Sequence, residues 1–242
     1  MIEVVDLTKR YAGRTAVNGI SFSVARGEIV GLLGPNGAGK STIFNLVTGY
    51  LPLTSGSISF NGAPIDRLPT TRIAQSGIAR AFQIAKPFPD LSVADNVRIG
   101  ALFGRTGPRD VAAETGRALE LTGLDALAGR RAGELTVGFL RRLELARAIA
   151  TRPVLLLADE PCAGLNPTET EEIITILRVI RERGVTVLLV EHDMQAVMRV
   201  SDRVFVLDAG NLIAAGTPAA VSRDPAVIAA YLGSEVDAPP NG

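Results

Sequence analysis

The sequence predicts an α/β fold with a parallel core, an N-terminal antiparallel β subdomain and an inserted α-helical subdomain. The stretch Ile29 to Thr42 reads as an apolar strand, a glycine loop and the start of a helix. Continuous apolar runs at 154–158 and 185–190 are typical of strands buried in a parallel sheet. Helical periodicity dominates the stretch from about residue 85 to residue 151, before these two runs. We expect an α/β core from 1–84 and 152–233, a helical subdomain at 85–151 and a tail at 234–242.

Composition narrows the classes of protein. The 242 residues are 47% hydrophobic and 21% charged, which is typical of a folded globular chain. Lys and Arg number 25 and so do Asp and Glu, so the balance does not favour a nucleic-acid partner. No apolar run approaches the roughly 18 residues that span a bilayer, and no leader is recognised. We expect a soluble chain, and Cys162 as a small buried residue.

The N-terminal region predicts strands at 2–7 and 17–24, joined later by a short alternating strand at 55–62. Tyr11 lies between the first two strands. Two interpretations stay open for it: an aromatic ring that stacks on a nucleobase, or an ordinary exposed tyrosine in a turn.

The glycine loop fits the phosphate-binding pattern G-x-x-x-x-G-K-[ST] through Gly34, Gly39, Lys40 and Ser41. Glycines let the backbone approach a ligand closely, and the following helix directs its N-terminus at it, so a polyphosphate is the expected ligand. Lys40 would contact the β and γ phosphates and Ser41 would coordinate Mg²⁺. The expected binding residues are Gly34, Pro35, Asn36, Gly37, Ala38, Gly39, Lys40, Ser41 and Thr42. The motif makes the predicted fold a P-loop NTPase with a RecA-like parallel core.

A helical turn at 69–76 and a strand at 77–82 lead to Gln83. Its amide is either a ligand of Mg²⁺ or of a nearby water, or a solvated group at a strand end. Farther along, Ser92 with Asp95 resembles a capping box that starts a helix. A break at 104–108 precedes a second helix at about 109–121.

A third helix begins near Gly138 and places Phe139, Leu143, Ala146 and Ala150 on one apolar face. Thr136 stands just before this helix. A hydroxyl and a glycine at a helix N-terminus suit a second anion site, whereas Thr136 alone suits an N-cap.

Two carboxylates, Asp159 and Glu160, directly follow the apolar run at 154–158. Ligands of open α/β sheets bind at the carboxyl ends of strands. Asp159 would hold Mg²⁺ through water, and Glu160 would orient the water that attacks the γ-phosphate. The alternative is that both residues only cap the next helix.

The rest of the chain predicts a helix from Pro167 to about Arg183 and a strand at 185–190. His192, the single histidine, follows that strand, where it either polarises a phosphate or is structural. Paired strands at 204–207 and 212–215 and helices at 217–223 and 225–232 complete the predicted fold.

Taken together in this order and spacing, the motifs resemble those of ABC-transporter ATP-binding subunits over residues 2–233. Five segments resemble the branch that serves branched-chain amino acid importers. They are Gly77 to Gln83 (GIARAFQ), Arg141 to Ala148 (RRLELARA), Ala163 to Pro167 (AGLNP), Glu191 to Met194 (EHDM) and Ala230 to Gly233 (AYLG).

This resemblance implies a Mg-dependent ATPase that uses ATP and Mg²⁺ as cofactors. It makes Tyr11 the adenine-stacking residue, Gln83 a mobile residue that touches both Mg²⁺ and the membrane partner, and His192 the contact to the γ-phosphate. It further implies integral-membrane permease subunits, a second ATP-binding subunit and, indirectly, a solute-binding protein as partners. The expected location is peripheral, on the cytoplasmic face of the inner membrane.

In the family each ATP lies between one subunit's phosphate loop and the partner subunit's L-S-G-G-Q motif. Here the motif reads Leu135-Thr136-Val137-Gly138-Phe139. Thr136 keeps the hydroxyl and Gly138 the close backbone approach, but Phe139 replaces Gln, so we expect weakened engagement of ATP.

Other functions fit parts of the same sequence. Phe139 also fits a partly degenerate half of a heterodimeric ABC ATPase. Urea, amides or aromatic acids are compatible solutes, because the solute never touches this subunit. A DNA-repair or translation ABC ATPase would need a coiled-coil insert or a second cassette, and a P-loop kinase would leave the segment at Leu135 without a role.

Overall fold

The computed structural model describes residues 1–105, 107 and 110–236. These residues form two compact units. The first unit joins Met1–Arg67 to the chain from Val190 onward, and the second is Leu68–Leu189.

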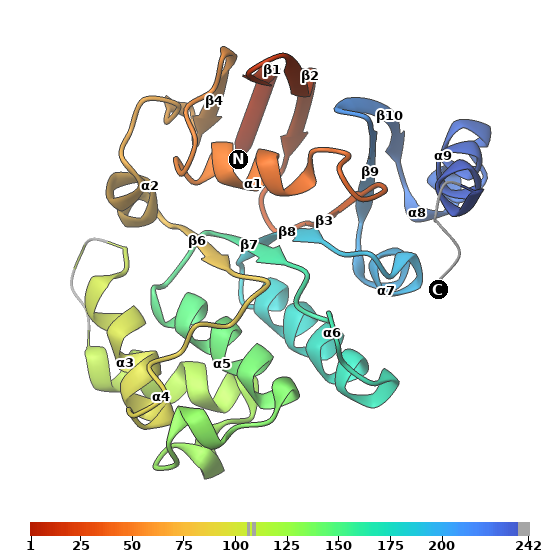
Figure 1. The fold of residues 1–242 in the computed structure, drawn as a ribbon. Helices are drawn as coiled ribbons and strands as arrows, with labels where there is room; N and C mark the ends of the chain where they lie inside the picture. Colours follow the sequence, from red (N-terminus) through yellow and green to blue (C-terminus); the bar gives the residue numbers. More distant parts are fainter. Residues whose placement is uncertain (106, 108–109, 237–242) are drawn as a thin grey trace. The chain divides into compact units, whose positions relative to one another are not determined.

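The first unit contains an antiparallel sheet with the strand order β2-β1-β4-β5 (Figure 1). Its strands are β1 (Ile2–Tyr11), β2 (Arg14–Val24), β4 (Ser55–Phe60) and β5 (Ala63–Pro64). β1 pairs with both β2 and β4, which confirms the predicted N-terminal sheet. The first two strands are longer than predicted because their pairing continues to Tyr11 and Arg14 at the hairpin turn.

The same unit holds β3 (Ile29–Leu33), which is fully buried and pairs in parallel with β9 (Arg203–Asp208). β10 (Asn211–Gly216) pairs with β9 in antiparallel fashion, as predicted. The unit's helices are α1 (Lys40–Val47), α7 (Met194–Val200), α8 (Pro218–Val221) and α9 (Pro225–Val236). α9 continues through Ser234, where the sequence predicted a tail, and residues 237–242 lie outside the described residues.

The second unit contains neighbouring strands in the order β8-β7-β6, of which β6 and β7 pair in parallel. They are β6 (Ile78–Ala81), β7 (Leu155–Asp159) and β8 (Thr186–Val190). All residues of β7 and β8 are buried, which confirms the prediction from their continuous apolar runs. α2 (Thr70–Ser76) precedes β6, and α6 (Pro167–Glu182) begins with a capping box between Asn166 and Glu169.

Three helices of this unit, α3 (Val93–Phe103), α4 (Val111–Thr122) and α5 (Val137–Ala150), enclose a hydrophobic core of their own (Figure 1). Ser92 caps α3 by accepting a hydrogen bond from the Asp95 backbone N–H at 3.0 Å, as predicted. Short 3₁₀ turns at Asp125–Leu127 and Ala132–Glu134 were not predicted. The predicted start of α4 at Arg109 lies outside the described residues.

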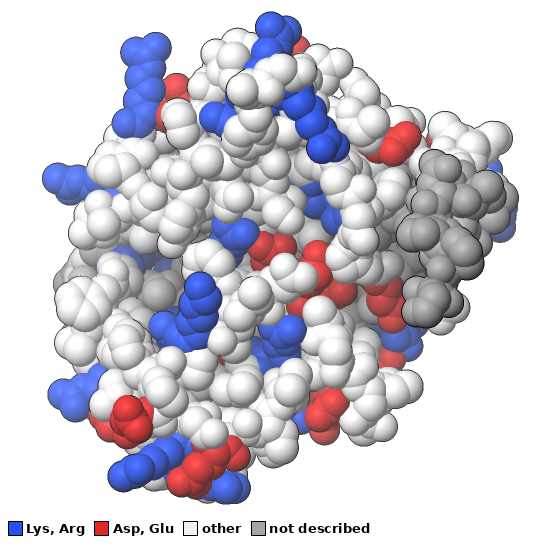
Figure 2. All heavy atoms as spheres, viewed as in Figure 1, with Lys and Arg blue, Asp and Glu red and all other residues white. Residues whose placement is uncertain are grey.

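The surface carries both signs of charge. On the face seen in Figure 2, basic and acidic side chains are interspersed. None of the helices in the described part of the chain combines the length and hydropathy needed to cross a bilayer.

The core of the three helices generates a stability prediction. Leu143 is fully buried within it, so Leu143→Ala should lower the free energy of unfolding by about 2–5 kcal/mol, because the mutation leaves a cavity. Leu102→Ala on α3 is the matched control, since Leu102 is 44% exposed. Urea unfolding of both variants measures the difference, and equal losses would contradict the assignment of this core.

Candidate functional site

The phosphate loop connects the buried strand β3 to helix α1. Gly34, Gly37 and Gly39 have positive φ values of 147°, 80° and 104°. A Cβ atom on Gly34 would lie 2.2 Å from the Leu207 carbonyl oxygen, and one on Gly39 would lie 2.6 Å from the Ala16 carbonyl oxygen. Both the backbone conformation and the lack of space therefore require glycine at these two positions.

Lys40 is the first residue of α1 and is 5% exposed. Its Nζ donates hydrogen bonds to the backbone oxygens of Gly34, at 2.5 Å, and Pro35, at 2.9 Å. The ammonium group is therefore held against the loop that it would serve. The first turn of α1 contains no acidic residue, so nothing there opposes the binding of an anion.

The other loop residues differ in exposure. Ala38 is buried, and its backbone oxygen accepts a hydrogen bond of 3.1 Å from the Gly210 backbone N–H in the turn between β9 and β10. Asn36 and Ser41 are exposed and Thr42 is half-buried. The Ser41 hydroxyl is thus accessible to a ligand at the start of the helix.

The two carboxylates at the end of β7 are buried, with Asp159 4% exposed and Glu160 5% exposed. Asp159 forms an ion pair with Arg80 of β6. Glu160 accepts a hydrogen bond from the Gln83 side-chain amide, and its φ of 48° is unusual for a residue other than glycine. The structure thus brings Gln83 and Glu160 together, as two of the three residues predicted to be catalytic.

Gln83 is itself exposed, in the irregular segment after β6. The exposure of Gln83 fits the interpretation as a solvated group at a strand end, and its amide also donates a hydrogen bond to the buried Glu160 carboxylate. Its role in metal binding stays a prediction.

The segment before α5 places Thr136 at the N-cap position, but the Thr136 side chain accepts no capping hydrogen bond. Gly138 is buried in the first turn, where a Cβ atom would lie 2.5 Å from the Glu169 carboxylate. Phe139 packs against the core of the three helices, with the Arg142 guanidinium 5.3 Å from its ring centre. The four residues predicted to form the apolar face of α5 all contact this core.

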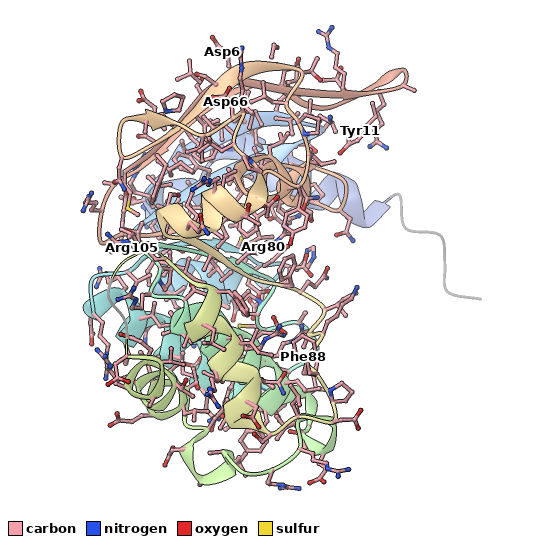
Figure 3. All side chains as sticks on the ribbon, turned by 90° about the vertical axis from the view of Figure 1, so that its left-hand side faces the viewer. Asp6, Tyr11, Asp66, Arg80, Phe88 and Arg105 are labelled. Carbon is pink, nitrogen blue, oxygen red and sulfur yellow. The ribbon has the colours of Figure 1, made fainter. Side chains whose placement is uncertain are left out.

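His192 is exposed and follows the buried Glu191, whose carboxylate accepts a 3.2 Å hydrogen bond from the His192 backbone N–H. Tyr11 lies at the end of the β1–β2 hairpin and is 45% exposed (Figure 3). Its ring is open to solvent on one side, and the Lys9 ammonium lies 5.2 Å from the ring centre.

Two residues near these groups were not predicted. Arg80, the partner of Asp159, lies within the GIARAFQ segment, which predicts a family branch but not this ion pair. Tyr231 of α9 reaches the phosphate loop, where burial raises the pKa of its hydroxyl and the Gly34 backbone acts in the opposite direction. The AYLG segment contains Tyr231, but it indicates only the family branch and does not predict this contact.

Comparison with known families identifies this arrangement. The ABC transporter family matches residues 17–163, which include the phosphate loop, Gln83 and both carboxylates of β7. The chain belongs to the ABC transporter family. A second family, the branched-chain amino acid ATP-binding cassette transporter, matches residues 211–237. Family membership confirms the predicted class of enzyme, an ATPase that binds ATP.

Individual relatives agree with this ABC assignment. The chain is 40% identical to the high-affinity branched-chain amino acid transport ATP-binding protein BraF of Pseudomonas aeruginosa, over 96% of this chain and 98% of BraF. The ADP conformation of the ATP-binding cassette MJ1267 matches with a TM-score of 0.87 and 29% identity, over 96% and 98% of the two chains. The dimeric cassette MJ0796 bound to ADP and Pi matches with a TM-score of 0.81 and 25% identity, over 90% and 99%. The relatives fit the predicted function and do not favour the alternatives.

The contact of Tyr231 with the phosphate loop generates a pH prediction. Because the folded-state pKa is raised above 10.0, the neutral hydroxyl contributes stability that is fully present below pH 10 and is lost as pH rises through the folded-state pKa. The stability of the parent chain relative to Tyr231→Phe should therefore stay constant up to about pH 9 and fall as pH rises above 10, as measured by denaturant unfolding. Tyr50→Phe is the control, since Tyr50 is 55% exposed. Parallel pH curves for the parent and Tyr231→Phe would contradict the prediction.

Proposed function

We propose that the chain is the ATP-hydrolysing motor subunit of an importer for branched-chain or related amino acids, and that it drives a membrane permease by ATP-dependent dimer closure. The observation that carries the proposal is the phosphate loop, in which glycine-only backbone and the buried Lys40 are held ready for a polyphosphate. The match of residues 211–237 to the branched-chain family supports the class of solute.

The phosphate loop binds the triphosphate through its backbone N–H groups and the N-terminus of α1. Lys40 exchanges the backbone oxygens of Gly34 and Pro35 for β- and γ-phosphate oxygens, which form stronger, charge-assisted hydrogen bonds. Tyr11 stacks on the adenine. The dimeric state of MJ0796 supports closure between two subunits, in which Thr136 and Gly138 of one subunit meet the γ-phosphate held by the other.

The donor atoms of Ser41, Gln83 and Asp159 fit Mg²⁺, because this ion prefers hydroxyl, amide and carboxylate oxygens. The described residues contain no group of three or more His, Cys, Asp or Glu side chains that would hold a metal by itself. A magnesium ion that takes part of its coordination from water and phosphate needs no such group. When bound, Mg²⁺ offsets the charge that develops on the phosphates.

Hydrolysis falls to the groups at the strand ends. Glu160 orients the attacking water and accepts its proton, after the Gln83 amide has released the Glu160 carboxylate. His192 contacts the γ-phosphate from its exposed position after β8. The buried setting of Glu160 suits this role, because a carboxylate shielded from bulk solvent acts on one ordered water.

An exposed apolar segment around Gln83 supports a membrane partner. Its large side chains are Phe82, Ile84, Phe88 and Leu91, which are 38%, 68%, 46% and 39% exposed. Exposed apolar residues in such number mark an interaction site. We assign this segment to the permease, and propose that the chain works at the cytoplasmic face of the membrane, linked only indirectly to a solute-binding protein.

Removal of the lysine ammonium tests the nucleotide site. Lys40→Ala should lower ATP affinity by about a hundredfold, because the phosphates lose their buried charge-assisted donor. Titration calorimetry with Mg-ATP measures the change. Lys86→Ala, which removes an exposed ammonium elsewhere, is the control. Unaltered affinity in Lys40→Ala would overturn the proposed site.

Dimer closure is tested in Glu160→Gln, which should bind ATP but hydrolyse it slowly. Its solution mass should double when Mg-ATP is added, and adding Phe139→Gln should lower the ATP concentration required, because the amide restores a contact of the family motif. Light scattering after size-exclusion chromatography measures the mass, and Lys40→Ala in the same background should stay monomeric. If Glu160→Gln stays monomeric in Mg-ATP both with Phe139 and with the added Phe139→Gln change, the homodimeric motor is overturned and a paralogous partner is indicated.

A further inference from the structure

The ion pair between Arg80 and Asp159 follows from the register of two neighbouring strands. β6 and β7 run parallel, with Arg80 opposite Leu157 and Ala81 opposite Ala158. Asp159 comes two residues after Leu157, so Arg80 and Asp159 project from the same face of the sheet. The long arginine side chain reaches one step toward the carboxyl end and meets the Asp159 carboxylate.

The pair is buried and its guanidinium is fixed on a second side. The side chains of Arg80 and Asp159 are 9% and 5% exposed. The Arg80 guanidinium also lies over the Phe82 ring, 4.7 Å from its centre. This cation–π contact holds the guanidinium on a second side, and a lysine ammonium, being a compact point charge, would make it differently. Figure 3 labels Arg80 and shows its position among the side chains.

The ion pair with Arg80 compensates the charge of a buried carboxylate at the end of β7. A buried carboxylate is costly unless a positive charge or several hydrogen-bond donors compensate it. Asp159 and Glu160 are adjacent and both buried, so their charges also repel each other. The segment that includes β6 and Gln83 supplies a partner to each: Arg80 to Asp159 and the Gln83 amide to Glu160.

We propose that Arg80 is the resident counter-ion of Asp159 and competes with Mg²⁺ for it, so that Arg80 sets how much Mg²⁺ increases nucleotide affinity. This inference rests on the proposed function, in which Asp159 serves the metal. A carboxylate oxygen that accepts a charge-assisted hydrogen bond from a guanidinium is less available to a hydrated cation. Arg80 is thus a positioning residue. In the absence of Mg-ATP it compensates the charge of Asp159, and when Mg²⁺ is present it lowers the affinity of Asp159 for the metal.

The test is the ratio of two dissociation constants for a non-hydrolysable ATP analogue, one measured in EDTA and one in excess Mg²⁺. Arg80→Met should raise this ratio by about tenfold, because the metal no longer competes with a charge-assisted hydrogen bond. Arg80→Lys keeps the charge but loses the guanidinium that lies over the Phe82 ring, so its ratio should lie between those of the parent and Arg80→Met. Arg98→Met, at an exposed position on α3, should leave the ratio unchanged.

An Asp159→Asn background separates competition from a structural role. In the Asp159→Asn background, Arg80→Met should not change the ratio, because the carboxylate for which Arg80 and Mg²⁺ compete is absent. A merely structural Arg80 would weaken binding equally in EDTA and in Mg²⁺. Equal weakening, or a rise that persists in the Asp159→Asn background, would overturn the proposal.

Two further outcomes concern the metal site itself and the folding of the Arg80→Met variant. If the parent chain shows no increase in affinity with Mg²⁺, the proposed metal site fails and not the role of Arg80 alone. If Arg80→Met does not fold, the ratio of Arg80→Lys decides, and a value equal to that of the parent would overturn the proposal.

Discussion

The absence of space around the phosphate loop is the constraint on which the nucleotide site depends. The backbone at Gly34 passes the Leu207 carbonyl, and the backbone at Gly39 passes the Ala16 carbonyl, at distances that no Cβ atom tolerates. The loop is therefore wedged between the end of β9 and strand β2, and Gly210 fixes it further through a hydrogen bond to Ala38. A loop held in this way keeps its N–H groups in place before a ligand arrives, which reduces the entropy lost on binding.

Compensation of charge is the second organising principle, and the same logic applies in each unit. In the first unit Lys40 is buried against two backbone oxygens of its own loop, and in the second Asp159 is buried against Arg80. Each group that would meet an ion of opposite charge thus has a substitute partner within the chain. Binding then exchanges one partner for another and does not bury a new isolated charge, which would be far more costly.

The features that sequence reasoning found are those set by local pattern. The phosphate loop, the apolar strands β7 and β8 and the face of α5 each follow from spacing within one segment. The Arg80 contact was missed because it depends on the register between β6 and β7, which no single segment encodes. α7 was not predicted, although Asp193 caps it by accepting a hydrogen bond from the Ala196 N–H, a local signal that the sequence carries. Thr136 stands at the N-cap position as sequence pattern suggests, yet only the structure shows that its hydroxyl makes no cap.

That missing cap bears on Phe139, the main departure from the family motif. Without a capping bond, the Thr136 hydroxyl is not committed to the first turn of α5, in which Gly138 is buried beside the Glu169 carboxylate. Phe139 turns toward the core of the three helices and stacks with Arg142, which also pairs with Glu172 of α6. The aromatic ring therefore adds packing on the inner side of α5. In the proposed closed dimer, Phe139 lacks the amide that a glutamine would offer to ATP, whereas the helix N-terminus and the hydroxyl that would face the γ-phosphate are retained.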